Sequence, residues 1–224
     1  MNYDENRWFS LRFGVYHLWK LRKVFGEKVI TSTKYQKERE AWIVAVTLLG
    51  ITKITKETWW IQIPKEDIPD IRAMTLTPDE NKNWNYVNYR DVEVMEITKY
   101  SKNNIIEEIL HKIKDKYYGN KTGLVVYLRR DENIPDMKLL SQKLRDKIKN
   151  IADIWIVGNT KPNTNDFIVF SIFPDVQVIN FNVDEEIIKI LPGDTIDLSR
   201  AKGTKAELIK GEFYVVFNPK VTKR

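Results

Sequence analysis

Hydrophobic residues recur at helical spacing in two stretches near the N-terminus. The first stretch, residues 7–24, predicts a helix or helical hairpin that ends at Gly26. The second stretch, residues 33–49, predicts a longer helix that stops at Gly50, because glycine commonly follows the last helical turn. The chain is therefore expected to begin with helices.

One face of the second predicted helix contains an acidic residue. Trp42, Ala45 and Leu49 fall on a single face when the chain turns by about 100° per residue. Glu38 lies on that face, whereas Glu40 points away from it. Glu38 is therefore the carboxylate that this helix is expected to direct toward the interior.

Stretches with strand composition follow the second helix. Residues 58–63, 68–76 and 91–100 are rich in Trp, Ile, Val and Thr and are separated by polar turn residues, as in an antiparallel meander. Residues 77–89 contain proline, aspartate and several asparagines, which predicts a long hairpin loop between the second and third strands.

Helices and buried strands alternate in the next part of the chain. A helix is predicted to begin at Asn103 or Asn104, and the apolar residues 124–128 predict a strand that is buried on both faces. A further helix at residues 136–150 and a strand at residues 154–157 predict parallel strands joined by a crossover helix. The remainder is expected to be mainly strands, at residues 167–173, 176–181 and 212–217.

The composition is that of a folded chain. Hydrophobic residues make up 42% and aromatic residues 12%, which supplies enough apolar surface for a core. At 224 residues, the chain is expected to form a single domain over residues 1–224. The absence of cysteine excludes disulfides, thiolate nucleophiles and cysteine-bound metals. Because His17 and His111 are the only imidazoles, a zinc enzyme is not expected.

The charge balance is basic, with a formal net charge of +6 and a pI near 9.2. This balance is compatible with a polyanionic partner such as nucleic acid, although many basic proteins bind none. The N-terminal stretch is interrupted by charged residues and predicts neither a signal peptide nor a membrane span. The protein is therefore expected to be cytoplasmic, with no membrane partner.

Two acidic residues occupy strand positions that suit metal chemistry. Pro69 and Asp70 open the second predicted strand, and Glu96 lies within the third. Other Pro–Asp pairs occur in the chain, but only this one opens a predicted strand directly before an acidic strand. Carboxylates from adjacent strands can share a divalent cation, which stabilises negative charge on a phosphate and activates water.

The alternation of side chains along the third strand favours Glu96 over Glu93. Val92 and Val94 share a face with Glu96, so an ionised carboxylate there would need a partner such as a metal.

Each candidate also has a purely structural interpretation. Asp70 could cap a strand end, Glu96 could pair with a lysine across the sheet, and Glu38 could pair with Lys34.

The order helix, three strands, helix, strand, together with Asp70 after Pro69 and Glu96 on the next strand, resembles the PD-(D/E)XK or restriction-endonuclease-like superfamily. The resemblance covers residues 34–160. It implies an α/β fold with an αβββαβ core, a mixed sheet flanked by helices, preceded by an N-terminal helical segment and followed by a β-rich extension over residues 161–224. It further implies Mg²⁺ or Mn²⁺ bound by Asp70 and Glu96, with Glu38 as an additional ligand.

The sequence departs from that family at one position. The family places a lysine two residues after the glutamate, but Thr98 follows Glu96 at this spacing and Lys99 lies on the other side of the strand. A threonine can orient a water molecule but cannot supply positive charge. Thr98 and Lys99 are expected near the attacking water, with Lys65 and Lys102 as other candidates for a relocated lysine.

The leading hypothesis is a metal-dependent endonuclease that hydrolyses DNA phosphodiester bonds. Its expected catalytic residues are Asp70, Glu96, Thr98 and Lys99. The departure from the family pattern leaves a second hypothesis open, a catalytically inactive nuclease-fold module that binds nucleic acid or a protein partner. A third is a structural or interaction protein whose carboxylates have no catalytic role. A homodimer is one of the assemblies left open.

Overall fold

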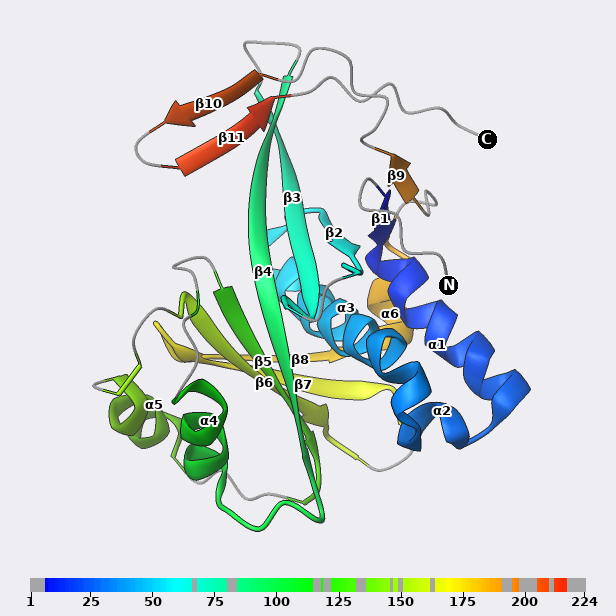
Figure 1. Cartoon of the computed structure of the whole chain (residues 1–224), viewed down its shortest axis with the longest axis vertical. Coiled ribbons are helices and arrows are strands. Elements are labelled where there is room, and N and C mark those ends of the chain that lie inside the picture. The colour runs from blue at the N-terminus through cyan, green and yellow to red at the C-terminus, as the bar shows by residue number, and fades with distance from the viewer. Residues whose placement is uncertain are drawn as a thin grey trace.

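The computed structural model of the chain (Figure 1) describes residues 7–65, 68–79, 84–114, 118, 122–131, 136–145, 147–148, 151–161, 164–190, 195–197, 205–209 and 212–216. The strands are β1 Arg7–Ser10, β2 Trp59–Gln62, β3 Ile71–Asp79, β4 Trp84–Thr98, β5 Thr122–Arg129, β6 Asp153–Asn159, β7 Asp166–Phe173, β8 Gln177–Asn182, β9 Thr195–Asp197, β10 Lys205–Ile209 and β11 Glu212–Val216. The helices are α1 Leu11–Phe25, α2 Lys28–Thr31, α3 Gln36–Thr55, α4 Ile105–Ile113, α5 Met137–Arg145 and α6 Val183–Ile187, with a 3₁₀ turn at Thr33–Tyr35.

Among these residues, the strands form a nine-stranded mixed sheet in the order β8-β7-β6-β5-β4-β3-β2-β1-β9, and β10 and β11 form a separate hairpin. Strands β2, β3 and β4 are antiparallel neighbours. Strands β4, β5 and β6 are parallel, and α4 and α5 provide the two crossovers. The predicted α/β class and the order helix, three strands, helix, strand are confirmed.

Helices cover both faces of the central strands (Figure 1). α1 and α3 pack on one face, where Val44, Ile61 and Val125 belong to one buried core. α4 and α5 cover the other face, where Ile109 and Ile154 belong to a second core. Burial of each such side chain stabilises the fold by roughly 1.5–3 kcal/mol. Strands between the two cores therefore have no solvent-facing side along their central residues.

The N-terminal prediction needs one correction. Residues 7–10 form β1 and pair with β2 and β9 instead of belonging to a helix. The Ser10 side chain then accepts a hydrogen bond from the Phe13 N–H, and this cap starts α1. Gly26 ends α1 with φ of 66°, as the sequence predicts.

Gly50 does not stop the second helix, contrary to the prediction. α3 continues to Thr55, and Lys56 after it adopts a left-handed conformation with φ of 62°. A methyl group on Gly50 would lie 2.8 Å from the Phe181 ring. The glycine therefore permits close packing between α3 and β8.

The hairpin loop predicted at residues 77–89 is also wrong in its extent. β3 continues to Asp79 and β4 begins at Trp84, with Thr77 paired to Tyr86 across the strands; residues 80–83 lie outside the described residues. Cross-strand hydrogen bonding in this long hairpin overrides the local turn preference of asparagine and proline.

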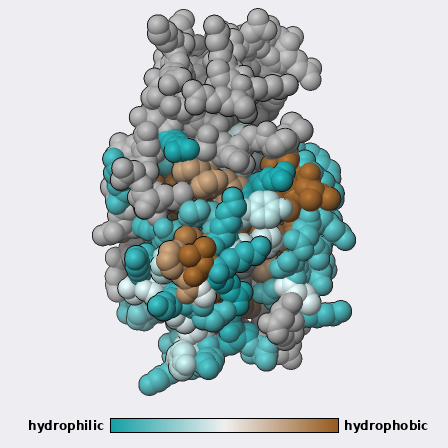
Figure 2. Space-filling model, turned by 90° about the vertical axis from the view of Figure 1, so that its right-hand side faces the viewer, coloured by the Kyte–Doolittle hydropathy of each residue, from teal (hydrophilic) through white to brown (hydrophobic). Residues whose placement is uncertain are grey.

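Figure 2 shows the face around α1 and α2, at the right of Figure 1. Hydrophilic side chains cover most of the described surface there, and hydrophobic ones gather in small separate areas. None of the described helices combines the length and the apolar character that crossing a membrane requires.

Candidate functional site

Asp70 lies immediately before β3, beyond the residues that pair with β2. β2 ends at Gln62, which pairs with Arg72, so no β2 residue pairs with the chain at Asp70. Oδ2 of Asp70 accepts a 2.8 Å hydrogen bond from the Val94 N–H of β4. The Asp70 side chain thus takes the place of a backbone acceptor for the Val94 N–H. This bond holds the Asp70 carboxylate against β4.

A single ammonium group joins Asp70 to Glu93. Nζ of Lys112, in the last turn of α4, lies 4.0 Å from Oδ2 of Asp70 and 3.5 Å from Oε2 of Glu93. The Glu93 side chain is only 2% exposed, whereas Lys112 is 23% exposed. Two carboxylates from adjacent strands therefore converge on one cation near the surface.

A third carboxylate, Glu40, reaches this region from α3. Its Oε1 accepts a 2.8 Å hydrogen bond from Gln36 Nε2, and its Oε2 lies 3.7 Å from Nζ of Lys37. No described group donates a hydrogen bond to Oε2, although the side chain is only 6% exposed. Burial raises the pKa of Glu40, and the nearby negative charge of Asp70 adds to the increase.

Lys37 completes the group. Its ammonium lies 3.3 Å from the backbone oxygen of Asp70 and 4.0 Å from Oδ1 of the same residue. We call the set Glu40, Asp70, Glu93, Lys37 and Lys112 the acidic notch. Its members come from α3, the residue before β3, β4 and α4, so helices on both faces of the sheet contribute beyond the end of β2.

Tyr118 lies beside the acidic notch and donates a hydrogen bond to the backbone oxygen of Lys112. Burial, together with the negative charges of Glu93 and Asp70, raises the pKa of the Tyr118 phenol. The phenol therefore stays protonated at neutral pH and acts as a hydrogen-bond donor.

The structure does not bring Glu96 to Asp70, contrary to the arrangement predicted from the sequence. Glu96 is three residues beyond Glu93 on the same strand, so it points to the opposite face. It pairs there with Arg39 at 3.3 Å and with Arg129 at 2.9 Å. Its carboxylate is therefore balanced by two guanidinium groups.

Glu40, not Glu38, is the α3 carboxylate that approaches Asp70, and the prediction that Glu40 points away from the interior is wrong because its side chain is buried. Glu38 acts electrostatically on His17 of α1, where burial lowers the histidine pKa and Glu38 opposes this change. α3 is buried almost all around from Glu40 to Ile51, so it has no single apolar stripe from which to infer its inner face.

Thr98 and Lys99 lie at the end of β4, four or more residues and about 13 Å along the strand from Val94. The Thr98 hydroxyl accepts a hydrogen bond from the Tyr100 N–H, and the Lys99 ammonium lies over the Tyr100 ring. Lys65 and Lys102 are exposed. None of these four candidates has a described contact with the acidic notch.

The sequence does not predict Lys112 at the site, and it favours Glu96 over Glu93. Lys112 is three residues after Ile109, which is completely buried, and this helical spacing could have placed it on the inner side of α4. No comparable signal separated Glu93 from Glu96, because helices bury both faces of β4.

The donors of the acidic notch suit a hard divalent cation, which prefers carboxylate oxygens. Within the described residues, no three Asp, Glu or His side chains are already grouped to hold an ion. Asp70 and Glu93 share a cation partner, and the buried Oε2 of Glu40 accepts no described hydrogen bond. The residues therefore fit a site in which two carboxylates bind the ion and a third is close by.

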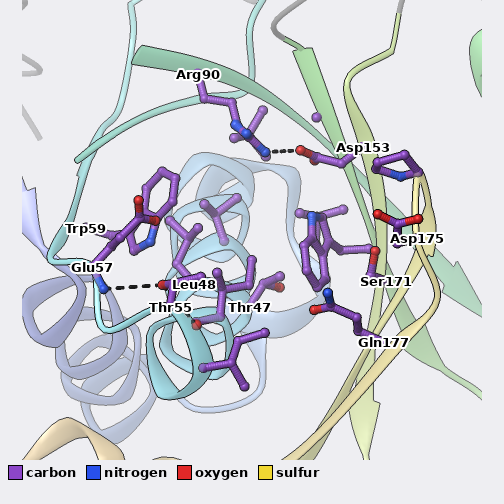
Figure 3. Close-up of a pocket in the computed structure, with 18 residues that line it drawn as sticks. Thr47, Leu48, Thr55, Glu57, Trp59, Arg90, Asp153, Ser171, Asp175 and Gln177 are labelled. Atoms are coloured by element: carbon purple, nitrogen blue, oxygen red, sulfur yellow. Dashed lines mark hydrogen bonds and ion pairs between the residues drawn. The ribbon is translucent and has the colours of Figure 1, made fainter. Parts of the chain in front are cut away.

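A cavity of about 290 Å³ lies elsewhere, between α3 and the sheet (Figure 3). At one side of it, Arg90 of β4 and Asp153 of β6 point toward each other and form an ion pair. Gly123 of β5 lies beneath this pair, and a methyl group there would overlap Oδ1 of Asp153. The ion pair has a structural explanation, because it joins two strands that flank β5.

Comparison with known proteins finds no matching family model, no matching curated protein and no matching solved structure.

Proposed function

We propose that the acidic notch is a metal-dependent site that hydrolyses phosphodiester bonds, and that the chain is an endonuclease-like protein acting on DNA. The supporting observation is the convergence of Asp70 and Glu93 on the Lys112 ammonium. Two carboxylates can hold the divalent ion that supplies activated water for phosphodiester hydrolysis, and a nearby ammonium can offset the charge of the phosphate.

The fold-level proposal is a divergent restriction-endonuclease-like core. α3, the meander of β2, β3 and β4, the crossover α4 and the parallel strand β5 occur in the order expected for that core. In this proposal Asp70, just before the second strand, and Glu93 on the third are the acidic residues of that core, with Glu93 in place of the Glu96 that the resemblance implied. Fold alone does not establish function, so the proposal depends on the acidic notch.

The positive group of the site comes from a helix in this proposal. The residue two positions after Glu93 is Met95, so the strand itself supplies no lysine. Lys112 of α4 supplies an ammonium from outside the strand, and it contacts both carboxylates. A lysine that has moved from β4 to α4 explains why the sequence lacks Glu-x-Lys.

Each residue has a defined role. Asp70 and Glu93 would hold Mg²⁺ or Mn²⁺, with Glu40 as an additional ligand. The ion, when bound, would stabilise negative charge on the phosphate and lower the pKa of a bound water. The Val94 N–H orients Asp70, and the partly exposed Lys37 and Lys112 attract the phosphate and offset its charge.

An inactive nucleic-acid-binding module is the second candidate. Lys37 and Lys112 already pair with the carboxylates, so the acidic notch is partly charge-balanced without a metal. Such a module would bind DNA with strong salt dependence and cleave none.

Plasmid nicking tests the proposal. Supercoiled plasmid is incubated with Mg²⁺ or Mn²⁺ and with wild type, Asp70→Asn, Glu93→Gln or Lys112→Gln. The proposal expects nicking by wild type, loss by about 100-fold or more in the three variants, and unchanged nicking by Glu96→Gln. If wild type nicks no plasmid with either ion but binds DNA in a salt-sensitive way, the inactive nucleic-acid-binding module is the correct function and the enzyme is not.

A further inference from the structure

A second cavity, of about 500 Å³, lies on the α3 face of the sheet. α1, α2 and α3 form one side of it, and the carboxyl ends of the parallel strands β4, β5 and β6 form the other. Ligands of α/β proteins commonly bind at the carboxyl ends of parallel strands, and this volume is within the range of small-molecule sites. The acidic notch shares none of the residues that line this cavity.

Positive charge exceeds negative charge around the cavity. Arg22, Arg39 and Arg129 line it together with Glu27 and Glu96. Glu27 pairs with Arg22, and Glu96 lies between Arg39 and Arg129. Three guanidinium groups and two carboxylates leave one positive charge unbalanced, which favours an anionic ligand.

Arg129 is best placed to bind that anion. Its Nη1 donates to Glu96 Oε2 at 2.9 Å and lies 3.5 Å from the backbone oxygen of Ile30. Its Nε and Nη2 donate no hydrogen bond to any described group. Arg39, in contrast, directs Nη1 to the backbone oxygens of Val29 and Ser32 and Nε to Glu96. Glu96 thus acts as a positioning residue that fixes two guanidinium groups at the cavity.

Aromatic rings provide the apolar wall. Trp42 meets Tyr127 and Phe167 edge to face, with ring centroids 5.5 Å and 5.8 Å apart. Trp19 of α1 lines the cavity as well. A wall of aromatic side chains favours a planar ring, which can stack on or pack edge-on against them.

Amide groups at the rim add directional contacts. Asn159 ends β6, and Asn165 immediately precedes β7; both line the cavity. Asn159 Nδ2 donates to the Thr164 backbone oxygen, which orients the amide. Asparagine amides can pair with the polar edge of a heterocyclic ring.

We propose that this cavity binds a small planar aromatic anion, a ring that carries a phosphate or a carboxylate. The ring packs against Trp42 and Tyr127, and the anionic group pairs with Arg129. The proposal is independent of the acidic notch and of nuclease activity.

Calorimetric titration of the full chain in EDTA tests this binding. The probes are AMP and indole-3-carboxylate as aromatic anions, adenosine as a ring without charge, and ribose 5-phosphate as a charge without a ring. At least one aromatic anion should bind with a Kd below about 1 mM, and adenosine and ribose 5-phosphate should bind at least about tenfold more weakly than AMP if AMP is the ligand. Binding of AMP alone assigns the site to phosphates, and binding of indole-3-carboxylate alone assigns it to carboxylates.

Arg129→Gln should weaken binding of the aromatic anion by at least about tenfold. The matched control is Arg130→Gln, because Arg130 is the next residue and donates to the backbone oxygens of Ser101 and Asn103, away from the cavity. Arg129→Lys, which keeps the charge and loses the planar fork, replaces Arg129→Gln if that variant does not fold. No binding by either aromatic anion, or equal affinity in the Arg129 and Arg130 variants, would overturn the proposal.

Discussion

Asp70 and Val94 are joined by a 2.8 Å hydrogen bond from the backbone N–H of β4 to a carboxylate oxygen. β3 begins with the Ile71–Val92 pair. The bond joins Asp70, the residue before Ile71, to Val94, two residues after Val92. It therefore fixes the Asp70 carboxylate beside Glu93, the residue before Val94. The backbone of β4 thus positions the two carboxylates that define the acidic notch.

The Asp70–Val94 bond allows structural and catalytic roles to be separated. Asp70→Asn keeps an oxygen acceptor for the Val94 N–H, whereas Asp70→Ala leaves that N–H without its partner. We expect Asp70→Ala to be less stable than Asp70→Asn by about 1–2 kcal/mol, and both to lose nicking. Urea unfolding and plasmid nicking measure the two effects. Full nicking by Asp70→Asn would show that the reaction does not need the Asp70 carboxylate.

Lys112→Met should destabilise the protein by about 3 kcal/mol, because it removes the ammonium that pairs with the buried Glu93. A divalent ion should compensate, since it would take the place of the ammonium between Asp70 and Glu93. Mg²⁺ should therefore raise the melting temperature of Lys112→Met more than that of wild type. Equal Mg²⁺ effects on the two proteins would argue against an ion site at this position.

Stability should depend on pH through Glu40. Its pKa in the folded protein is raised above the ordinary value of 4.5, mainly by burial. The folded state therefore binds the proton more tightly, and the contribution of Glu40 to stability is present below pH 4.5 and lost as pH rises through the raised pKa. Glu40→Gln should be more stable than wild type at pH 7, with an advantage that disappears near pH 4. Thermal melts across this range measure the difference, and a constant advantage would contradict the assignment.

Gly123 should tolerate no side chain. Gly123→Ala should cost about 1–3 kcal/mol, because its methyl group would overlap the Asp153 carboxylate that pairs with Arg90. Gly158→Ala on β6 is the matched control, since a methyl group there would meet Leu128 atoms at 3.5 Å and 3.7 Å, which is ordinary contact. Its stability should stay within about 0.5 kcal/mol of wild type. Equal losses in the two variants would contradict the packing explanation.

Much of the fold was predictable from local patterns. The apolar run in β5 identified a strand buried on both faces, and Asn104 caps α4 as expected, accepting a hydrogen bond from the Glu107 N–H. The extended β3–β4 hairpin was not predictable, because its asparagine-rich residues owe their strand conformation to pairing across the hairpin.

The candidate site was predictable only in part. Asp70 stood out because Pro69 and Asp70 precede a strand, but the partner carboxylates depend on orientation. α3 and β4 are buried on nearly all sides near the site, so periodicity could not decide between Glu38 and Glu40 or between Glu93 and Glu96. Lys112 comes from a helix distant in sequence, and only the topology brings it to Asp70.

The most direct test of the acidic notch is Mn²⁺ binding measured by calorimetry in wild type, Glu93→Gln and Glu96→Gln. The two substitutions remove the same charge from opposite faces of β4. Wild type and Glu96→Gln should bind Mn²⁺ with similar affinity. Glu93→Gln should bind Mn²⁺ at least about tenfold more weakly. Loss of binding in Glu96→Gln with full binding in Glu93→Gln, or no Mn²⁺ binding by wild type, would contradict this account.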